Sequence, residues 1–155
     1  MVPEASPLQM IAPLYITAPE MQAPSKAEMR TLVWFPTASF SGKTIKTASL
    51  TLMRQNGSGK GSAVTLTLYG ITVASASGNP HTGKVSYGVI GVIDNGETKT
   101  FTLPTAAGQA MASGTIKGFM LYANDGGVMS GKSYSTNYCK ISSNGAAEPK
   151  LTITY

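Results

Sequence analysis

The sequence predicts an all-β fold: an antiparallel β-sandwich or jelly roll of about eight to ten strands with one short helix. Short segments of alternating apolar and polar residues recur along the chain, separated by clusters of Gly, Asn, Asp or Pro. Only 12% of the 155 residues are charged, against about 25% in typical soluble proteins, and Thr, Ser and Gly replace the missing charge. Because Thr favours strands and Gly favours turns, this composition suits many short strands.

The clearest strand pattern is the last one, residues 149–155. Leu151, Ile153 and Tyr155 alternate there with one lysine and two threonines. This is the pattern of a half-buried strand, and such a strand has to pair with earlier ones to satisfy its backbone groups. We therefore expect truncation at Pro149 to unfold the domain.

The length fits one domain, which we divide into an extended arm, residues 1–27, and a β-sandwich, residues 28–155. The arm holds five of the nine prolines, a spacing that forbids a helix and weakens a sheet ladder. It also carries apolar residues that need a cover, which make it a candidate assembly arm: Leu8, Met10, Ile11, Leu14, Tyr15 and Ile16.

Two interpretations of this arm remain open. In the first, residues 14–17 form an edge strand on the chain's own sheet. In the second, the arm docks on a neighbouring subunit. The two are equally weighted for residues 14–17, and the neighbour is favoured for residues 1–11.

Within the sandwich, residues 28–35 predict a strand buried on both faces, because four consecutive apolar residues precede Pro36. Alternation predicts further strands at residues 44–54, with Ala48, Leu50 and Leu52 on one face, and at residues 64–68. These two strands either pair as neighbours or cross between sheets.

The second half of the chain follows the same plan. In residues 84–93, apolar side chains at 85, 87, 89 and 93 share one parity, while Gly88 and Gly91 indicate a bulge or bend. Residues 98–103 predict a strand with Phe101 and Leu103 inward, and Pro104 ends it. Residues 106–112 are the one plausible helix, and residues 116–122 and 132–143 predict two more strands.

The loops between these strands are polar and exposed, so they are candidate contact surfaces. The segment at residues 57–62 resembles a phosphate-binding loop in its glycines, but a strand follows it where such a loop requires a helix. The candidate loop contacts are Asn56, Ser58, Lys60, Asn79, His81, Asn124 and Asp125.

The sequence favours a protein that is not an enzyme and has no catalytic, metal or cofactor site. The only histidine, His81, lies far in sequence from the only cysteine, Cys139, so a nucleophile and base are not paired. Acidic residues between positions 30 and 140 are Asp94, Glu97 and Asp125 alone. Asp94 and Asp125 precede glycines, where Asp suits a turn, and a calcium ion on one turn is the weaker interpretation.

Nucleic acid and membrane are not expected partners. The net charge is +5, but the basic residues are spread singly, without the cluster that a nucleic-acid footprint needs. No apolar run approaches the roughly 18 residues of a membrane span. Prolines interrupt the first residues, so we expect no signal peptide and synthesis in a host cytoplasm.

Five segments resemble a known family, the β-sandwich modules related to the disaggregatase-type and "DNRLRE" domains. They are residues 30–35, 45–52, 118–121, 134–135 and 149–155. These modules look like carbohydrate-binding modules and occur on phage and bacterial surface proteins. The resemblance implies a sandwich that binds or assembles at a surface.

Two functional hypotheses follow. The first is a virion structural protein, a phage capsid-decoration or tail-appendage subunit that assembles through the arm with copies of itself and with other virion proteins. The absent signal peptide, the free cysteine, the Thr/Ser/Gly surface and the apolar arm favour it together. The alternative is an adhesion module for cell-surface glycans, which needs exposed aromatic residues; the candidates are Tyr69, Tyr87, Tyr122, Tyr134 and Tyr138.

Overall fold

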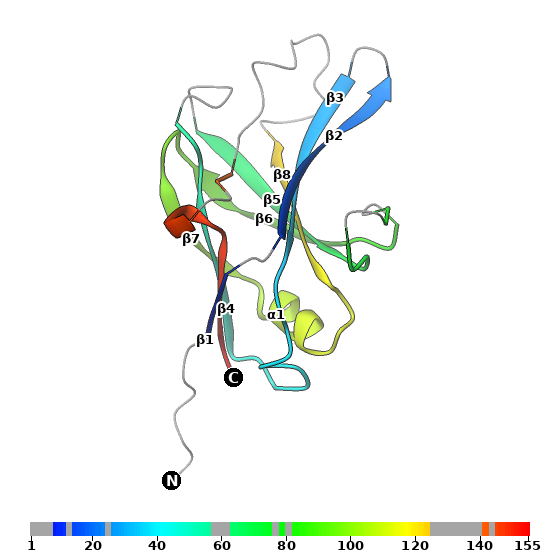
Figure 1. Ribbon diagram of the computed structural model, residues 1–155, viewed down its shortest axis with the longest axis vertical. Helices are drawn as coiled ribbons and strands as arrows, with labels where there is room; N and C mark the ends of the chain where they lie inside the picture. The colour runs from blue at the N-terminus through cyan, green and yellow to red at the C-terminus, as the bar shows by residue number, and fades with distance from the viewer. Residues whose placement is uncertain are drawn as a thin grey trace.

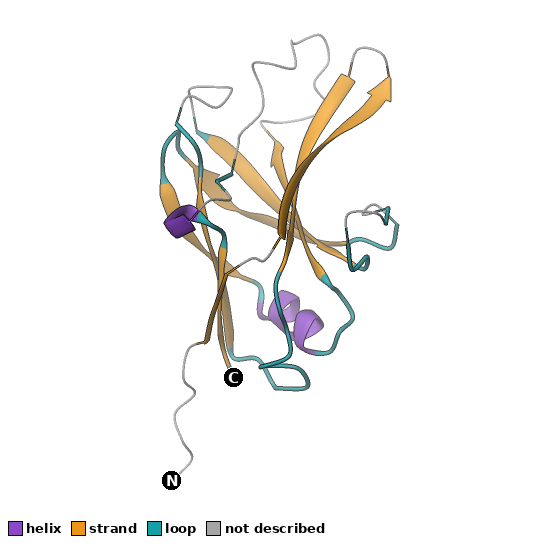
Figure 2. Ribbon diagram, viewed as in Figure 1, coloured by secondary structure: helices purple, strands orange, loops and turns teal. Residues whose placement is uncertain are grey.

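A computed structural model describes residues 8–11, 14–23, 26–56, 63–75, 78–79, 82–124, 141–142 and 145–155. The described part is built from strands, one α-helix and one 3-10 turn (Figures 1 and 2). In chain order these elements are β1 Leu8–Ile11, β2 Leu14–Ala23, β3 Lys26–Trp34, β4 Thr47–Met53, β5 Val64–Ile71, β6 Val85–Ile93, β7 Thr98–Leu103, α1 Thr105–Ala112, β8 Gly118–Asn124, η2 Gly145–Ala147 and β9 Lys150–Thr154.

Two antiparallel sheets form a sandwich, which confirms the predicted fold class with its single short helix. Sheet A has the strand order β1-β9-β4-β7, and sheet B has the order β2-β3-β8-β5-β6. Strands β4 and β5 lie in different sheets, so of the two expected arrangements the chain uses the crossing one.

The strand pairs are nested in the sequence. The hairpin β5–β6 is innermost, β4–β7 encloses it, β3–β8 encloses that, and β1–β9 is outermost. A long antiparallel ribbon wrapped into two sheets has this order, and it is the jelly-roll arrangement with β2 added at one edge of sheet B. The closing strand β9 therefore lies between β1 and β4, inside sheet A.

The main core fills the space between the sheets. Inward side chains on β4 (Ala48, Leu50 and Leu52) and on β9 (Leu151 and Ile153) are at most 2% exposed. They meet Val33, Leu66, Leu68, Phe119 and Leu121 of sheet B in one cluster. The alternation that predicted β4 and β9 is thus the alternation of buried and outward positions.

A second, smaller cluster lies on the opposite face of sheet B. Leu32, Trp34, Ile71 and Met120 are buried there, and Val73 packs against them from the segment after β5. The indole Nε1 of Trp34 donates a 2.9 Å hydrogen bond to the carbonyl oxygen of Val73. Because β3 contributes to both clusters, its residues 32–34 and the following Phe35 are buried on both faces, as the sequence predicts.

Helix α1 covers one end of the core. Ala107, Met111 and Ala112 are buried, and the Gln109 side chain holds the loop between β3 and β4 to the helix. Its Oε1 accepts a 3.0 Å hydrogen bond from the backbone N–H of Ile45, and its Nε2 donates one of 3.1 Å to the carbonyl of Lys43. Figure 1 shows α1 at the end of the sandwich opposite to the hairpin of β2 and β3.

Strand β6 departs from simple alternation. Its pairing with β5 shifts register twice, between Leu66 and Thr67 and between Leu68 and Tyr69, and Gly88 and Gly91 have φ values of 80° and 148°. The bulge expected from these glycines is confirmed. The prediction that residues 85, 87, 89 and 93 face the same side is wrong, because the register shifts leave Ile93 buried and Val85 and Val89 exposed.

Candidate functional site

The outermost strand pair joins the two ends of the described chain. Strand β1 pairs with β9 in the register Leu8 to Ile153, Met10 to Leu151 and Ile11 to Lys150. Positions 8 and 10 thus stand opposite the two fully buried residues of β9. An edge strand that borders the core needs apolar residues at such positions, and residues 8 and 10 are both apolar.

The next segment of the predicted arm forms β2. Its positions 14, 15 and 16 pair with Trp34, Val33 and Leu32 of β3. For residues 14–17 the edge-strand interpretation is therefore confirmed. For residues 8–11, where a neighbour was favoured, the structure differs, because β1 lies on the chain's own sheet A.

The reason for that difference is long-range pairing. The sequence shows apolar residues at 8 and 10 but cannot show that β9 has a free side 140 residues later. The hairpin of β2 and β3 also spans the boundary drawn at residue 27. The described part of the predicted arm therefore contributes strands to both sheets of the sandwich.

The predicted loop contacts divide between two ends of the sandwich. Asn56 is exposed after β4, and its Oδ1 accepts a 2.8 Å hydrogen bond from the Nδ2 of Asn95, a contact residue that the sequence interpretation missed. Asn124 ends β8 opposite Thr65, at this same end of β5. Asn79 is exposed beyond the other end of β5, and Ser58, Lys60, His81 and Asp125 lie outside the described residues.

A buried arginine holds the loop end near Asn56 in place. The Arg54 side chain is fully buried, and its Nη1 donates a 3.3 Å hydrogen bond to the carbonyl of Ile93. Its backbone N–H donates to the carbonyl of Glu97, and its backbone bridges to Ile141. The end of β4, the turn at residues 94–97 and the segment before β9 are thus joined around one residue.

The outward face of sheet A is rich in hydroxyl groups, with Lys150 at one end, and we call it the hydroxyl face. Direct hydrogen bonds join Thr47 to Thr154, with 2.5 Å between the hydroxyl oxygens, and Thr51 to Thr100, with 2.7 Å. Its members are Thr47, Ser49, Thr51, Thr98, Thr100, Thr102, Thr152 and Thr154. Neutral hydroxyls without a neighbouring base can donate and accept hydrogen bonds but are weak nucleophiles.

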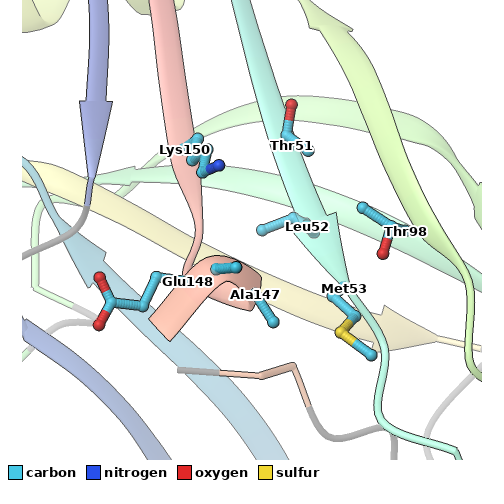
Figure 3. Close-up of a pocket in the computed structure, with 8 residues that line it drawn as sticks. Thr51, Leu52, Met53, Thr98, Ala147, Glu148 and Lys150 are labelled. Carbon is cyan, nitrogen blue, oxygen red and sulfur yellow. The ribbon is translucent and has the colours of Figure 1, made fainter. Parts of the chain in front are cut away.

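A small pocket lies at one end of the hydroxyl face (Figure 3). Thr51, Met53, Thr98 and Lys150 line it together with the segment at residues 146–148. It offers about 60 Å³, far below the roughly 300 Å³ at which small-molecule sites begin. The pocket can hold water but has no room for a sugar ring.

The sequence interpretation also missed three exposed valines on β6. Val85, Val89 and Val92 are 41%, 65% and 42% exposed and are the large exposed apolar side chains of the described chain. The glycines at 88 and 91 were the available signal, because bulges turn side chains outward. The Lys99 Nζ donates a 2.6 Å hydrogen bond to the carbonyl of Val92, and this contact and the bulges hinder pairing at this edge.

The tyrosines of the described part do not form an open aromatic platform. Tyr69 packs partly buried against the smaller cluster, and Tyr87 packs partly buried against the main core. Burial raises the pKa of the Tyr87 hydroxyl above its ordinary value of 10.0. Tyr122 is half-buried on β8, and Tyr134 and Tyr138 lie outside the described residues.

Among the residues that the structure describes, no three His, Cys, Asp or Glu side chains are grouped as metal ligands. No helix in the same ranges is long and apolar enough to cross a membrane. The described residues therefore offer strand edges, hydrogen-bonding surfaces and three exposed valines on β6.

Comparison with protein-family models and with curated proteins finds no match to this chain. The resemblance to the disaggregatase-related modules thus remains a prediction.

Proposed function

We propose that this protein is a non-enzymatic structural protein of a virus particle, a capsid-decoration or tail-appendage subunit that assembles through its N-terminal segment and presents its loops outward. One observation carries the proposal. The N-terminal segment supplies an edge strand to each sheet, β1 to sheet A and β2 to sheet B. Edge strands present unpaired backbone groups that favour pairing with another chain.

The fold is compatible with this function and with its alternative. Jelly-roll sandwiches occur in viral capsid proteins and in lectins, so the architecture alone does not choose between them. The choice depends on the surfaces. Among the described residues, Tyr69, Tyr87 and Tyr122 are at least half-buried and do not form an open platform for a sugar. These observations support assembly over glycan binding.

The proposal is tested on particles purified from cells that produce the full chain, residues 8–155 or residues 14–155. We expect the first two chains at a fixed copy number per particle and the third to be absent, because only the third lacks β1. The 8–155 chain is the matched control, since it loses residues but no described strand. Equal incorporation of residues 14–155 would refute the arm's role. A chain absent from particles that binds glycans on an array would support the alternative.

A further inference from the structure

We propose that β1 is exchanged between two copies of this chain, so that β1 of one copy pairs with β9 of its partner at the edge of sheet A. The inference rests on the proposed function, because it names the partner that the N-terminal segment binds. It assigns a donor strand and an acceptor edge, both of which are present in every copy.

The donor strand can leave with little disturbance. Strand β1 has four residues and pairs with β9 alone, and it is the first strand of the described chain. It belongs to the outermost of the nested pairs, so its departure breaks none of the pairs inside it. Two residues separate β1 from β2, which belongs to the other sheet. The two strands are therefore connected along the chain but do not pair with each other in a sheet.

The acceptor edge is costly to leave open. Without β1, one side of β9 has unpaired backbone groups from Lys150 to Ile153. Leu151 and Ile153 are fully buried within this stretch, so the open edge borders the core. A strand that pairs with this edge needs apolar residues at the positions opposite these two residues. In the register of the chain itself, Leu8 and Met10 occupy those positions. A second copy carries the same strand.

Exchange costs little because the exchanged contact is the one already made within each chain. A strand swapped between identical copies loses no pairing, so the remaining cost is the entropy of association. That cost falls as the protein concentration rises. Any new contact between the joined copies would stabilise the exchanged dimer further. The rest of the sandwich, from β2 to β9, stays within one copy.

Cysteine pairs test the exchange in the full chain, with Cys139→Ser as the background. Gln9 and Thr152 are paired positions, and paired Cα atoms are about 4.5 to 5.5 Å apart, within the roughly 4.4 to 6.8 Å range of disulfides. Chains with Gln9→Cys and chains with Thr152→Cys, given tags of different mass, are refolded together, concentrated and oxidised. We expect a covalent dimer that contains both tags.

Thr152 also provides the matched control, because it pairs with Ser49 on its other side. Chains with Ser49→Cys mixed with chains with Thr152→Cys should give no mixed dimer, since β4 and β9 belong to the same copy. The double variant Gln9→Cys/Thr152→Cys should link between chains in the oligomer and within the chain in the monomer.

The other outcomes overturn the inference in distinguishable ways. An oligomer whose 9–152 disulfides all lie within single chains would refute exchange and leave assembly standing. A chain that is monomeric at every concentration, with only internal disulfides, would refute the proposed self-assembly as well. A double variant that forms no disulfide would contradict the pairing of β1 with β9 itself.

Discussion

Trp34 packs against a position where only glycine fits. A Cβ atom on Gly118 would lie 2.5 Å from the carbonyl oxygen of Val33 and 2.9 Å from a ring carbon of Trp34. The ring fills this space and its Nε1 reaches the carbonyl of Val73, so one glycine allows β3 to carry a large buried side chain on the face of sheet B away from the main core.

We therefore expect Gly118→Ala to lower the free energy of unfolding by about 1–3 kcal/mol, the usual cost of overpacking. The contacts are with backbone and a rigid ring, which cannot move aside cheaply. Urea denaturation followed by circular dichroism measures the change. Thr102→Ala, an exposed position on the hydroxyl face, should stay within about 0.5 kcal/mol of the parent. Equal stability of Gly118→Ala and the parent would contradict this packing.

Burial of Tyr87 predicts a pH dependence. Desolvation raises the pKa of Tyr87 in the folded state, so above about pH 10 the unfolded chain releases this proton more readily than the folded chain. The free energy of unfolding should therefore decrease as the pH rises through that range. Denaturation of the parent and of Tyr87→Phe between about pH 8 and pH 11 measures this decrease. The parent should lose stability more steeply, and equal slopes would contradict the burial.

At the scale of elements, β9 determines how sheet A is held together. It pairs with β1 on one side and β4 on the other, and its two inward side chains belong to the main core. Removing it would separate β1 from the sheet and uncover Leu50, which pairs with Leu151. A terminal strand that lies inside a sheet cannot be removed as an edge strand can.

Truncation after Pro149 should therefore abolish cooperative unfolding. Thermal melting followed by near-ultraviolet circular dichroism would show no sharp transition, because the core loses Leu151 and Ile153. Removal of Tyr155 alone is the control and should preserve the transition, since this half-buried residue follows β9. A cooperative transition in the truncated chain would refute the role given to β9.

Alternation in the sequence predicts the strands well where the pairing is regular. Strands β4, β7 and β9 and helix α1 follow their patterns, because each presents one buried face. Strand β6 does not, because its two register shifts turn valines outward, and a shift depends on how the partner strand is placed. Of the predicted loop contacts, Asn56 is joined to the turn beyond β6 by a hydrogen bond that no local pattern signals.

For the whole molecule, the order in which the strands pair could not be predicted from the sequence. Individual strands are local features, whereas the nested pairs join residues as distant as Leu8 and Ile153. That distance is why the sequence favours a neighbour for residues 1–11, whereas residues 8–11 are found on the chain's own sheet A (Figure 1). The same segment is suited to both uses, because a neighbour's sheet presents an identical edge.

Sedimentation equilibrium tests most directly the claim that residues 1–13 join copies of the chain. The full chain should form an oligomer whose mass falls toward the 16.1 kDa monomer on prolonged dilution. Residues 14–155 should remain monomeric at every concentration and still melt cooperatively, because β9 keeps its pairing with β4. If residues 14–155 assembled to the same extent as the full chain, the account of the N-terminal segment would be contradicted.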